Sequence, residues 1–432
     1  MSALLGILTI ALLLYLIMSK RASPIVALIL VPLATGLAGG YGTELFAFMT
    51  EGIRSIAPTG VMFVFAILFF GILTDAGTFR PIIDALLKLA GRDPARITVA
   101  TALLAMMVHL DGSGAVTFLV TVPALLPLYD ALQLPRTTLA TIVALSAGTM
   151  NILPWGGPTL RAASALEVPV TELFNPLLIP VAAGLLFVLV LAFWMGKKRR
   201  GEKPGAVPVV SPEPEGLDGN SDRSLERPRL FWINILLILV SVGALISGFA
   251  PPHVVFIIAF ALAVSLNYPN LRQQAERINA HARAALLMAG ILFAAGCFTG
   301  ILKGSGMIDS MAVGAVDILP SWIGNHLAVW TGLASMPASL LFDPDSFYFG
   351  ILPLLASTAE HFGGDPMEVG RAAIMGQMTT GFPVSPLTGA TYLLVGLTGV
   401  DLGDHQRKTI PYAFLVTLLI LVVSLLIGAV SW

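Results

Sequence analysis

The chain of 432 residues is 56% hydrophobic and 11% charged, with a mean hydropathy of +0.88. Soluble domains carry about 25% charged residues, so this composition excludes most soluble classes and indicates a protein embedded in the lipid bilayer. The formal net charge of −1 lacks the basic excess that binds phosphate, and no nucleic-acid partner is expected. The one cysteine, Cys297, leaves the redox compartment open.

The apolar run that begins at Met1 has neither a basic amino-terminal region nor a small-residue cleavage site, so we expect a retained first helix. Further apolar stretches follow, several of them with the roughly 20 residues that cross a bilayer core. A polar segment at 197–229, rich in Pro, Gly, Ser and charge, predicts a solvated linker. It separates two apolar blocks, 1–196 and 230–432.

Two apolar regions differ from the others because a polar tip splits each of them. The region 97–128 is interrupted at 111–114 (DGSG), and the region 322–355 at 343–346 (DPDS). The arms beside each tip hold about a dozen residues, too few to span a bilayer core. We therefore predict two re-entrant hairpins. The alternative, ordinary spanning helices joined by a short loop, would need longer arms.

Two further segments, 138–167 and 368–397, begin as apolar helices and then accumulate glycine and proline. These residues are Pro154, Gly156, Gly157 and Pro158 in the first segment, and Gly381, Pro383 and Pro386 in the second. Proline removes a backbone donor and glycine is a poor helix former, so we predict that both helices break there. The amides freed at the following half-helix suit carboxylate groups. The alternative is a proline kink without a ligand.

Identities recur in the two blocks in the same order and at nearly constant separation. The matches are Gly71, Ile72 and Leu73 with Gly300, Ile301 and Leu302; Pro127 with Pro353; and Gly148, Met150 and Pro158 with Gly376, Met378 and Pro386. A duplicated unit with five crossings, an odd number, inverts its second copy. The predicted fold is therefore all-α and polytopic, with two inverted repeats that each hold a re-entrant hairpin and a broken helix. Such a build is typical of secondary transporters.

The basic residues support one topology. With both termini outside and the linker in the cytoplasm, all but four of the 24 Lys and Arg residues fall on the cytoplasmic side, as the positive-inside rule requires. The four exceptions are Arg54, Arg161, Lys303 and Arg371.

The segments FGILTDAGTF, HLDGSGAVTF and GTMNILPWGGPTLRAASALEVPVTELFNPL resemble the citrate–divalent metal:proton symporter (CitMHS) family of the ion transporter superfamily. The NILPWGGPT run is the most specific part, and the likeness covers nearly the whole chain. The resemblance implies proton-driven import of citrate complexed with a divalent cation such as Mg²⁺, without a covalent cofactor, in the cell inner membrane. It also implies a homodimer whose hairpins and broken helices move like an elevator against a scaffold.

Arg161 follows the first break and is the one basic residue expected inside the membrane in the first block. A charge there costs several kcal/mol unless it is paired. The complex of the citrate trianion with a divalent cation is a monoanion, which a single arginine balances, so we predict that the guanidinium binds a substrate carboxylate. The alternatives are a structural pair with Glu167, Glu172 or an acidic hairpin residue, or a head group that reaches the membrane interface.

Neutral hydrogen-bonding groups complete the predicted substrate site, although helical hydroxyls often bond back to their own turn. They are Asn151, Gly156, Gly157, Thr159, Thr380, Ser385, Thr388 and Thr391 at the breaks, and Ser113 and Ser346 at the hairpin tips.

The acidic residues at the tips are predicted to contact the metal or to carry protons. Oxygen ligands suit Mg²⁺, and a poorly hydrated carboxylate takes up a proton more readily. These residues are Asp111, Asp343 and Asp345. The alternative for an aspartate is capping of a hairpin arm. His109 suits a proton relay or a packing role.

The sequence thus predicts a secondary active transporter for a metal–citrate complex. Two alternatives remain open at this point. One is a sodium-coupled di- or tricarboxylate carrier, or a gluconate-type permease, of similar build. The other is an integral membrane enzyme that uses Asp343 and Asp345 as an acid pair, which would leave the duplicated breaks unexplained.

Overall fold

The computed structural model describes residues 2–19, 21–91, 93–198 and 223–432, and the regular structure of these residues is helical. Most of the predicted linker, residues 199–222, lies outside the described residues. The first half holds α1 (Ser2–Met18), α2 (Pro24–Ala38), α3 (Glu44–Asp75), α4 (Arg80–Ala90), α5 (Pro94–Val108), η1 (His109–Asp111), α6 (Gly114–Ala131), α7 (Arg136–Met150), α8 (Gly157–Leu166), α9 (Val170–Phe174), η2 (Asn175–Leu177) and α10 (Leu178–Lys197).

The second half repeats much of this order. It holds η4 (Arg223–Leu225), η5 (Pro228–Leu230), α11 (Phe231–Ile246), α12 (Pro252–Asn267), α13 (Leu271–Gly304), α14 (Met307–Ile318), α15 (Ser321–Gly324), α16 (Leu327–Ala338), η6 (Ser346–Ile351), α17 (Leu352–His361), α18 (Pro366–Ile374), η7 (Phe382–Val384), α19 (Gly389–Thr398) and α20 (Leu402–Leu426).

The two halves correspond in the lengths of their helices. The third long helix of each half, α3 and α13, has 32 and 34 residues, and the short helix after it, α4 and α14, has 11 and 12. The helices that follow the two breaks, α8 and α19, have 10 residues each. A duplicated unit predicts this order; the duplication and the block boundaries stay predictions.

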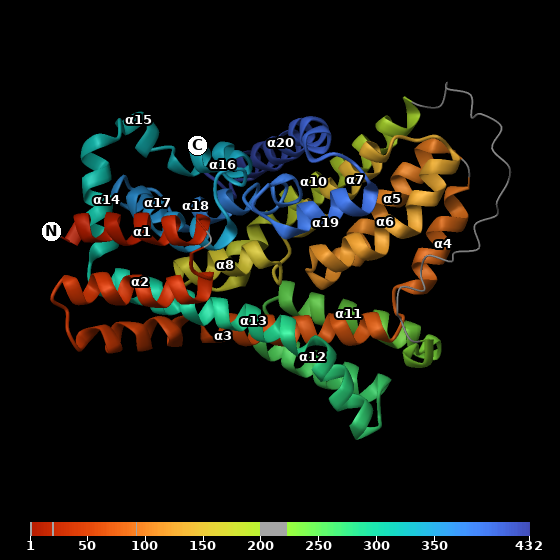
Figure 1. Cartoon of the computed structure of the whole chain (residues 1–432), viewed down its shortest axis with the longest axis horizontal. Coiled ribbons are helices and arrows are strands. Elements are labelled where there is room, and N and C mark those ends of the chain that lie inside the picture. The colour runs from red at the N-terminus through yellow and green to blue at the C-terminus, as the bar shows by residue number, and fades with distance from the viewer. Residues whose placement is uncertain (1, 20, 92, 199–222) are drawn as a thin grey trace.

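The helices α3 and α13 pack against each other along their length and form one layer of the molecule (Figure 1). Near the start of α3, an added Cβ on Gly52 would lie 2.8 Å from Gly300 Cα, so glycines allow the backbones to touch. At the other end, Asp75 accepts a hydrogen bond from His281 Nε2 at 2.9 Å. Because Gly52 meets the end of α13 and Asp75 meets its beginning, the two helices run antiparallel.

Six helical stretches of the described residues are long and apolar enough to cross a membrane, which agrees with the predicted all-helical membrane fold. They are Glu44–Asp75, Gly114–Ala131, Val170–Lys197, Pro228–Ile246, Leu271–Gly304 and Leu402–Leu426. Further apolar helices, among them α1, α2 and α12, have between 10 and 17 residues.

The hairpin arms differ in length from the expected dozen residues. In the first hairpin α5 has 15 residues and α6 has 18, and α6 is one of the six stretches long enough to cross. The second hairpin is shorter, with 12 residues in α16 and 10 in α17 after a π-helical turn of 6 residues. The re-entrant path of both hairpins stays a prediction.

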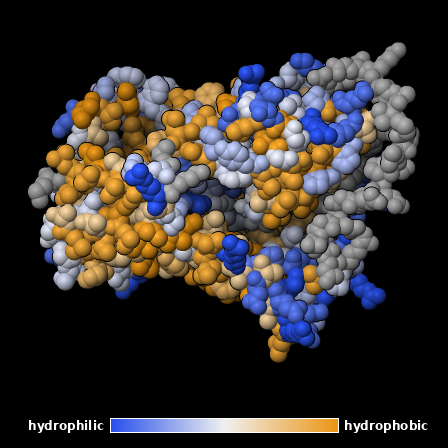
Figure 2. Space-filling view, viewed as in Figure 1, coloured by the Kyte–Doolittle hydropathy of each residue, from blue (hydrophilic) through white to orange (hydrophobic). Residues whose placement is uncertain are grey.

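The two hairpins lie toward opposite ends of the long axis. Figure 1 shows α5 and α6 at the end where the chain enters and leaves the linker, and α16 and α17 at the other end. Between them, α8 packs on α3 and α13 on one side and on α17 and α18 on the other. On the face in Figure 2, hydrophobic side chains cover the left and centre, and hydrophilic ones gather toward the linker end.

Candidate functional site

The first broken helix is interrupted between α7, which ends at Met150, and α8, which begins at Gly157. The turn closes tightly: a Cβ added to Gly156 would lie 2.1 Å from Asn151 O, which only glycine avoids. Thr159 Oγ1 reaches back across the break and donates to Ile152 O at 2.9 Å. This hydrogen bond stabilises the break from within. The break lies within the segment 138–167, where the sequence predicts it.

The second break is longer, from the end of α18 at Ile374 to the start of α19 at Gly389. Thr388 and Thr391 both donate to Phe382 O, at 2.8 and 3.0 Å. The hydroxyls of Thr380 and Ser385 are also occupied, the first by Thr417 Oγ1 and the second by Ser339 O, both at 2.5 Å. The four predicted hydroxyls thus stabilise the irregular backbone here.

The tip of the first hairpin lies against the first break. Trp155 Nε1, inside the break, donates to Leu110 O at 2.7 Å. Ser113 caps α6 by accepting from Val116 N at 3.3 Å, and His109 Nδ1 bonds to Thr117 Oγ1 at 2.8 Å. His109 is fully buried, and its Nε2 has no hydrogen-bond partner among the described residues. The backbone of Asp111 belongs to η1, and its side chain lies outside the described part.

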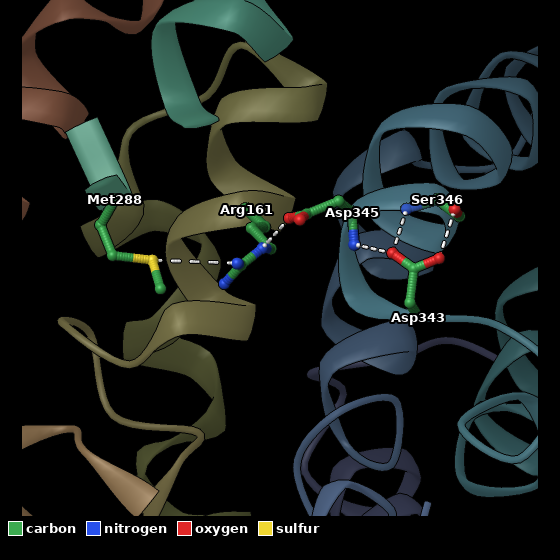
Figure 3. A network of polar contacts seen from close by, with 5 residues as sticks. All are labelled: Arg161, Met288, Asp343, Asp345 and Ser346. Carbon is green, nitrogen blue, oxygen red and sulfur yellow. Dashed lines mark hydrogen bonds and ion pairs between the residues drawn. The ribbon is translucent and has the colours of Figure 1, made fainter. Parts of the chain in front are cut away.

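The tip of the second hairpin is organised by Asp343 (Figure 3). Its Oδ1 accepts from the backbone N–H groups of Asp345 and Ser346 at 3.0 and 3.1 Å, and its Oδ2 accepts from Ser346 Oγ at 2.5 Å. These bonds cap the start of η6, and they occupy both carboxylate oxygens. The alternative capping role of an aspartate is thus present at Asp343, whereas Asp345 points out of the tip.

Asp345 pairs with Arg161. Figure 3 shows the guanidinium pointing from α8 toward the tip of the second hairpin, with Nε 2.7 Å from Asp345 Oδ1. The side chains are only 10% and 7% exposed, so both charges are largely withdrawn from water. Arg161 Nη2 also contacts the sulfur of Met288 on α13, at 3.9 Å. Of the alternatives for Arg161, the one realised is a pair with an acidic hairpin residue.

The two other acidic partners considered for Arg161 lie elsewhere. Glu167, at the end of α8, pairs with Lys303 of α13 at 2.6 Å. Glu172 accepts through its backbone oxygen from Arg371 at 3.3 Å. Among the described residues, no three His, Cys, Asp or Glu side chains gather closely enough to hold a metal ion.

Contacts between the halves bring the breaks and tips into one region. Asn151 Nδ2, at the first break, donates to Met378 O in the second break at 2.8 Å. The ring of Phe382, also in the second break, stacks on Phe118 of the first hairpin, with centroids 6.0 Å apart, and lies 6.2 Å from the ring of His109. With the pair of Arg161 and Asp345, all four irregular segments meet.

Several polar residues of this region are absent from the sequence-based predictions. Ser339, at the end of α16, accepts from Met378 N at 2.9 Å and donates to Gln377 Oε1. Gln377 Nε2 and Thr379 Oγ1 are buried without hydrogen-bond partners among the described residues. A glutamine inside an apolar stretch is costly in a membrane. Its occurrence at position 377 is the feature of the sequence that could have marked Gln377 as a candidate site residue.

Comparisons with known proteins identify the family of the chain. The profile of the CitMHS family, described as "Citrate transporter", matches residues 13–376. A citrate transporter of Bacillus subtilis (strain 168) is 43% identical over the full length of both chains. The Mg(2+)/citrate complex secondary transporter of the same organism is 41% identical, over 100% of this chain and 99% of its own.

Two solved structures share the fold. The YdaH transporter of Alcanivorax borkumensis has a TM-score of 0.61 at 16% identity, over 89% of this chain and 88% of its own. MtrF of Neisseria gonorrhoeae, described as one of a class of antimetabolite efflux pumps, has a TM-score of 0.64 at 14% identity, over 90% and 85%. The family and these relatives are transporters, which sets aside the alternative of a membrane enzyme. The chain belongs to the CitMHS family of citrate transporters.

Proposed function

We propose that this protein imports citrate as a complex with a divalent cation, coupled to protons, through the region where the breaks and tips meet. The names of the two relatives above, a citrate transporter and a transporter of the Mg²⁺–citrate complex, support citrate and its metal complex as the substrate. The metal ion is then cargo: citrate oxygens and water supply most of its ligands, as Mg²⁺ prefers.

The observation that carries the proposal is the buried pair of Arg161 and Asp345. A buried guanidinium pairs with a carboxylate because an unpaired charge costs several kcal/mol. A carboxylate of the substrate can replace Asp345 as the partner of the Arg161 guanidinium. Arg161 belongs to the broken helix of one half and Asp345 to the hairpin of the other, so exchanging one carboxylate for another changes a contact between the two halves.

A proton taken up during this exchange keeps the net charge of the site at zero. With Arg161 and Asp345 both ionised, the pair is neutral. If Asp345 takes up a proton as it leaves Arg161, the guanidinium and the monoanionic metal–citrate complex are again neutral together. One proton at Asp345 per complex therefore avoids a net charge in the membrane interior, where charge is costly. Asn151, which bridges the two breaks, completes the substrate contacts.

The remaining parts of the proposal concern motion and placement. The hairpins and broken helices move as one body against the layer of α3 and α13, and α4 and α14 connect that layer to the moving part. The two halves are inverted repeats, the transporter is a homodimer in the inner membrane, the linker is cytoplasmic and both termini are outside. The antiparallel packing of α3 and α13 supports the inverted arrangement.

Uptake of radiolabelled citrate into proteoliposomes tests the proposal. The expected result is uptake that requires Mg²⁺, Ca²⁺ or Zn²⁺, stops with EDTA, and accelerates with an inward proton gradient but not with an inward sodium gradient. Uptake that persists in EDTA contradicts the metal complex as substrate. Uptake that follows sodium alone instead supports the sodium-coupled carboxylate carrier.

A further inference from the structure

A groove with a volume of about 340 Å³ lies between α4, α5 and α10, toward the end of the molecule where the chain enters the linker (Figure 1). Leu86 of α4 and Phe193 of α10 line two of its sides, and a row of residues on α5 lines the third. Of the described residues that line the groove, only Arg96 is polar. The groove therefore favours an occupant that is mostly apolar and carries a charge at one place.

The row on α5 places its charge at one end. Arg96, Val99, Ala100 and Leu103 all line the groove, and their spacing puts them on one face of the helix. At a rise of 1.5 Å per residue, Leu103 lies about 10 Å along the helix axis from Arg96. The Arg96 side chain is 71% exposed, and its Nε lies 3.9 Å from Asp93 Oδ2. The groove thus begins at a largely exposed guanidinium and continues along apolar side chains.

The helix α10 has the same polarity along the groove. Its end touches the start of α5, because a Cβ added to Gly196 would lie 2.6 Å from Ala95 Cα. Lys197 is exposed and follows Phe193 by four residues, so it lies one turn beyond Phe193 on the same face of α10. Both helices therefore have a basic residue at this end and apolar residues beyond it. We call Arg96 and Lys197 the basic mouth of the groove.

The basic mouth lies at a helix end with the features of a membrane boundary. Trp194, next to Phe193, is 49% exposed, and Lys198 Nζ lies 5.6 Å from the centroid of its ring. Exposed tryptophan and lysine at the end of an apolar helix are typical of the layer between hydrocarbon and water. The stretch Val170–Lys197, which ends here, is long and apolar enough to cross the membrane. The groove therefore opens among lipid headgroups and runs into the hydrocarbon.

We infer that the groove binds one anionic phospholipid, with its phosphate at Arg96 and an acyl chain along Val99 and Leu103. A guanidinium forms paired hydrogen bonds with phosphate oxygens, and basic pockets between membrane helices are suited to anionic headgroups. The one acidic group described at the mouth, Asp93, already caps α5 by accepting from Ala95 N at 3.0 Å. The basic mouth thus keeps an excess of positive charge for the lipid.

The same charges argue against a second copy of the chain as the occupant. A protein surface packed over the groove would bury Arg96 and Lys197 without a phosphate to pair them, and buried unpaired charge is costly. A zwitterionic lipid fits the apolar part of the groove but has no net negative charge for the basic mouth. The inference goes beyond the proposed function, because no part of it depends on the transported substrate.

Native mass spectrometry of the protein in dodecyl maltoside tests the inference. The protein is titrated with palmitoyl-oleoyl phosphatidylglycerol, which is anionic, or with the phosphatidylcholine of the same chains, which is zwitterionic. A basic residue near an anionic headgroup contributes about fivefold to binding. We expect the first phosphatidylglycerol to bind more tightly than phosphatidylcholine, and Arg96→Gln to weaken phosphatidylglycerol binding about fivefold while binding of phosphatidylcholine stays unchanged.

The matched control is Arg54→Gln. Arg54 is also an exposed arginine, with 74% of its side chain accessible and an acidic partner three residues away, but it lies on α3 and does not line the groove. We expect Arg54→Gln to bind both lipids like the wild type. Equal binding of the two lipids by the wild type, or equal losses in Arg96→Gln and Arg54→Gln, would overturn the inference.

A second variant tests the apolar part of the groove. Leu103→Trp fills the space beside Val99 and should weaken binding of the first phosphatidylglycerol, whereas Leu119→Trp, at a position of α6 that is 53% exposed and outside the groove, should not. The same spectra report the oligomeric mass. If Leu103→Trp or Arg96→Gln changes that mass and leaves lipid binding unchanged, the groove is a contact between copies of the chain and the inference is wrong.

Discussion

The pair of Arg161 and Asp345 gives the sharpest prediction. Since both side chains are at most 10% exposed, removing one partner leaves a buried, uncompensated charge. Asp345→Leu and Arg161→Met should each lower the free energy of unfolding by about 3–5 kcal/mol. Replacing both charges by apolar side chains removes the uncompensated charge as well, so the double variant should lie within about 2 kcal/mol of the wild type.

The assay is a double-mutant cycle, measured by unfolding the purified protein in mixed micelles of dodecyl maltoside and SDS. The control is the pair of Arg136 and Asp130, which is also 2.7 Å long but has side chains 47% and 43% exposed. Breaking that pair should cost at most about 1 kcal/mol. The reasoning is refuted if the losses of the two buried single variants simply add in the double variant.

The same double variant separates stability from transport. It restores folding but has no arginine for the substrate, so we expect the folded protein to show no citrate uptake. Full uptake by the double variant would show that the pair is only structural.

Three further predictions concern the breaks. Gly156→Ala places a Cβ 2.1 Å from Asn151 O and should prevent accumulation of folded protein in the membrane, whereas Gly243→Ala, in open space, should not. Asn151→Ala leaves Met378 O without its donor, and should reduce the uptake rate at least tenfold while the protein still elutes as one species from a sizing column. Ser339→Ala removes the hydrogen bond to Met378 N and should lower the free energy of unfolding by about 1–3 kcal/mol; an unchanged value contradicts a structural role for Ser339.

The interruptions of the helices could be expected from the sequence because proline and glycine act locally. Pro154 and Gly156 stand where the first break lies. The second break begins earlier than Gly381, at the end of α18, and Met378 has a positive φ of 54°. A side chain other than glycine in this conformation needs support from the fold, and the support comes from Ser339 and Asn151, which are distant in sequence.

The partners of the charged residues could not be predicted, because they depend on how the two halves pack. Arg161 had Glu167, Glu172 and the acidic hairpin residues as candidate partners in the sequence, and its partner Asp345 lies 184 residues away. Glu167, closer along the chain, pairs instead with Lys303. The hairpin tips likewise offered three aspartates, and the structure uses Asp343 as a cap and Asp345 in the ion pair.

Binding of Mg²⁺–citrate to the purified protein, measured by isothermal titration calorimetry, tests directly whether Arg161 holds the substrate. We expect binding to the wild type, no binding in EDTA, and at least roughly tenfold weaker binding to Arg161→Met, because a charged hydrogen bond of about 1.5–3 kcal/mol is lost. Arg371→Met, which removes an arginine bonded only to backbone oxygens among the described residues, should bind like the wild type. Equal affinity in the wild type and Arg161→Met would contradict the assignment of the site.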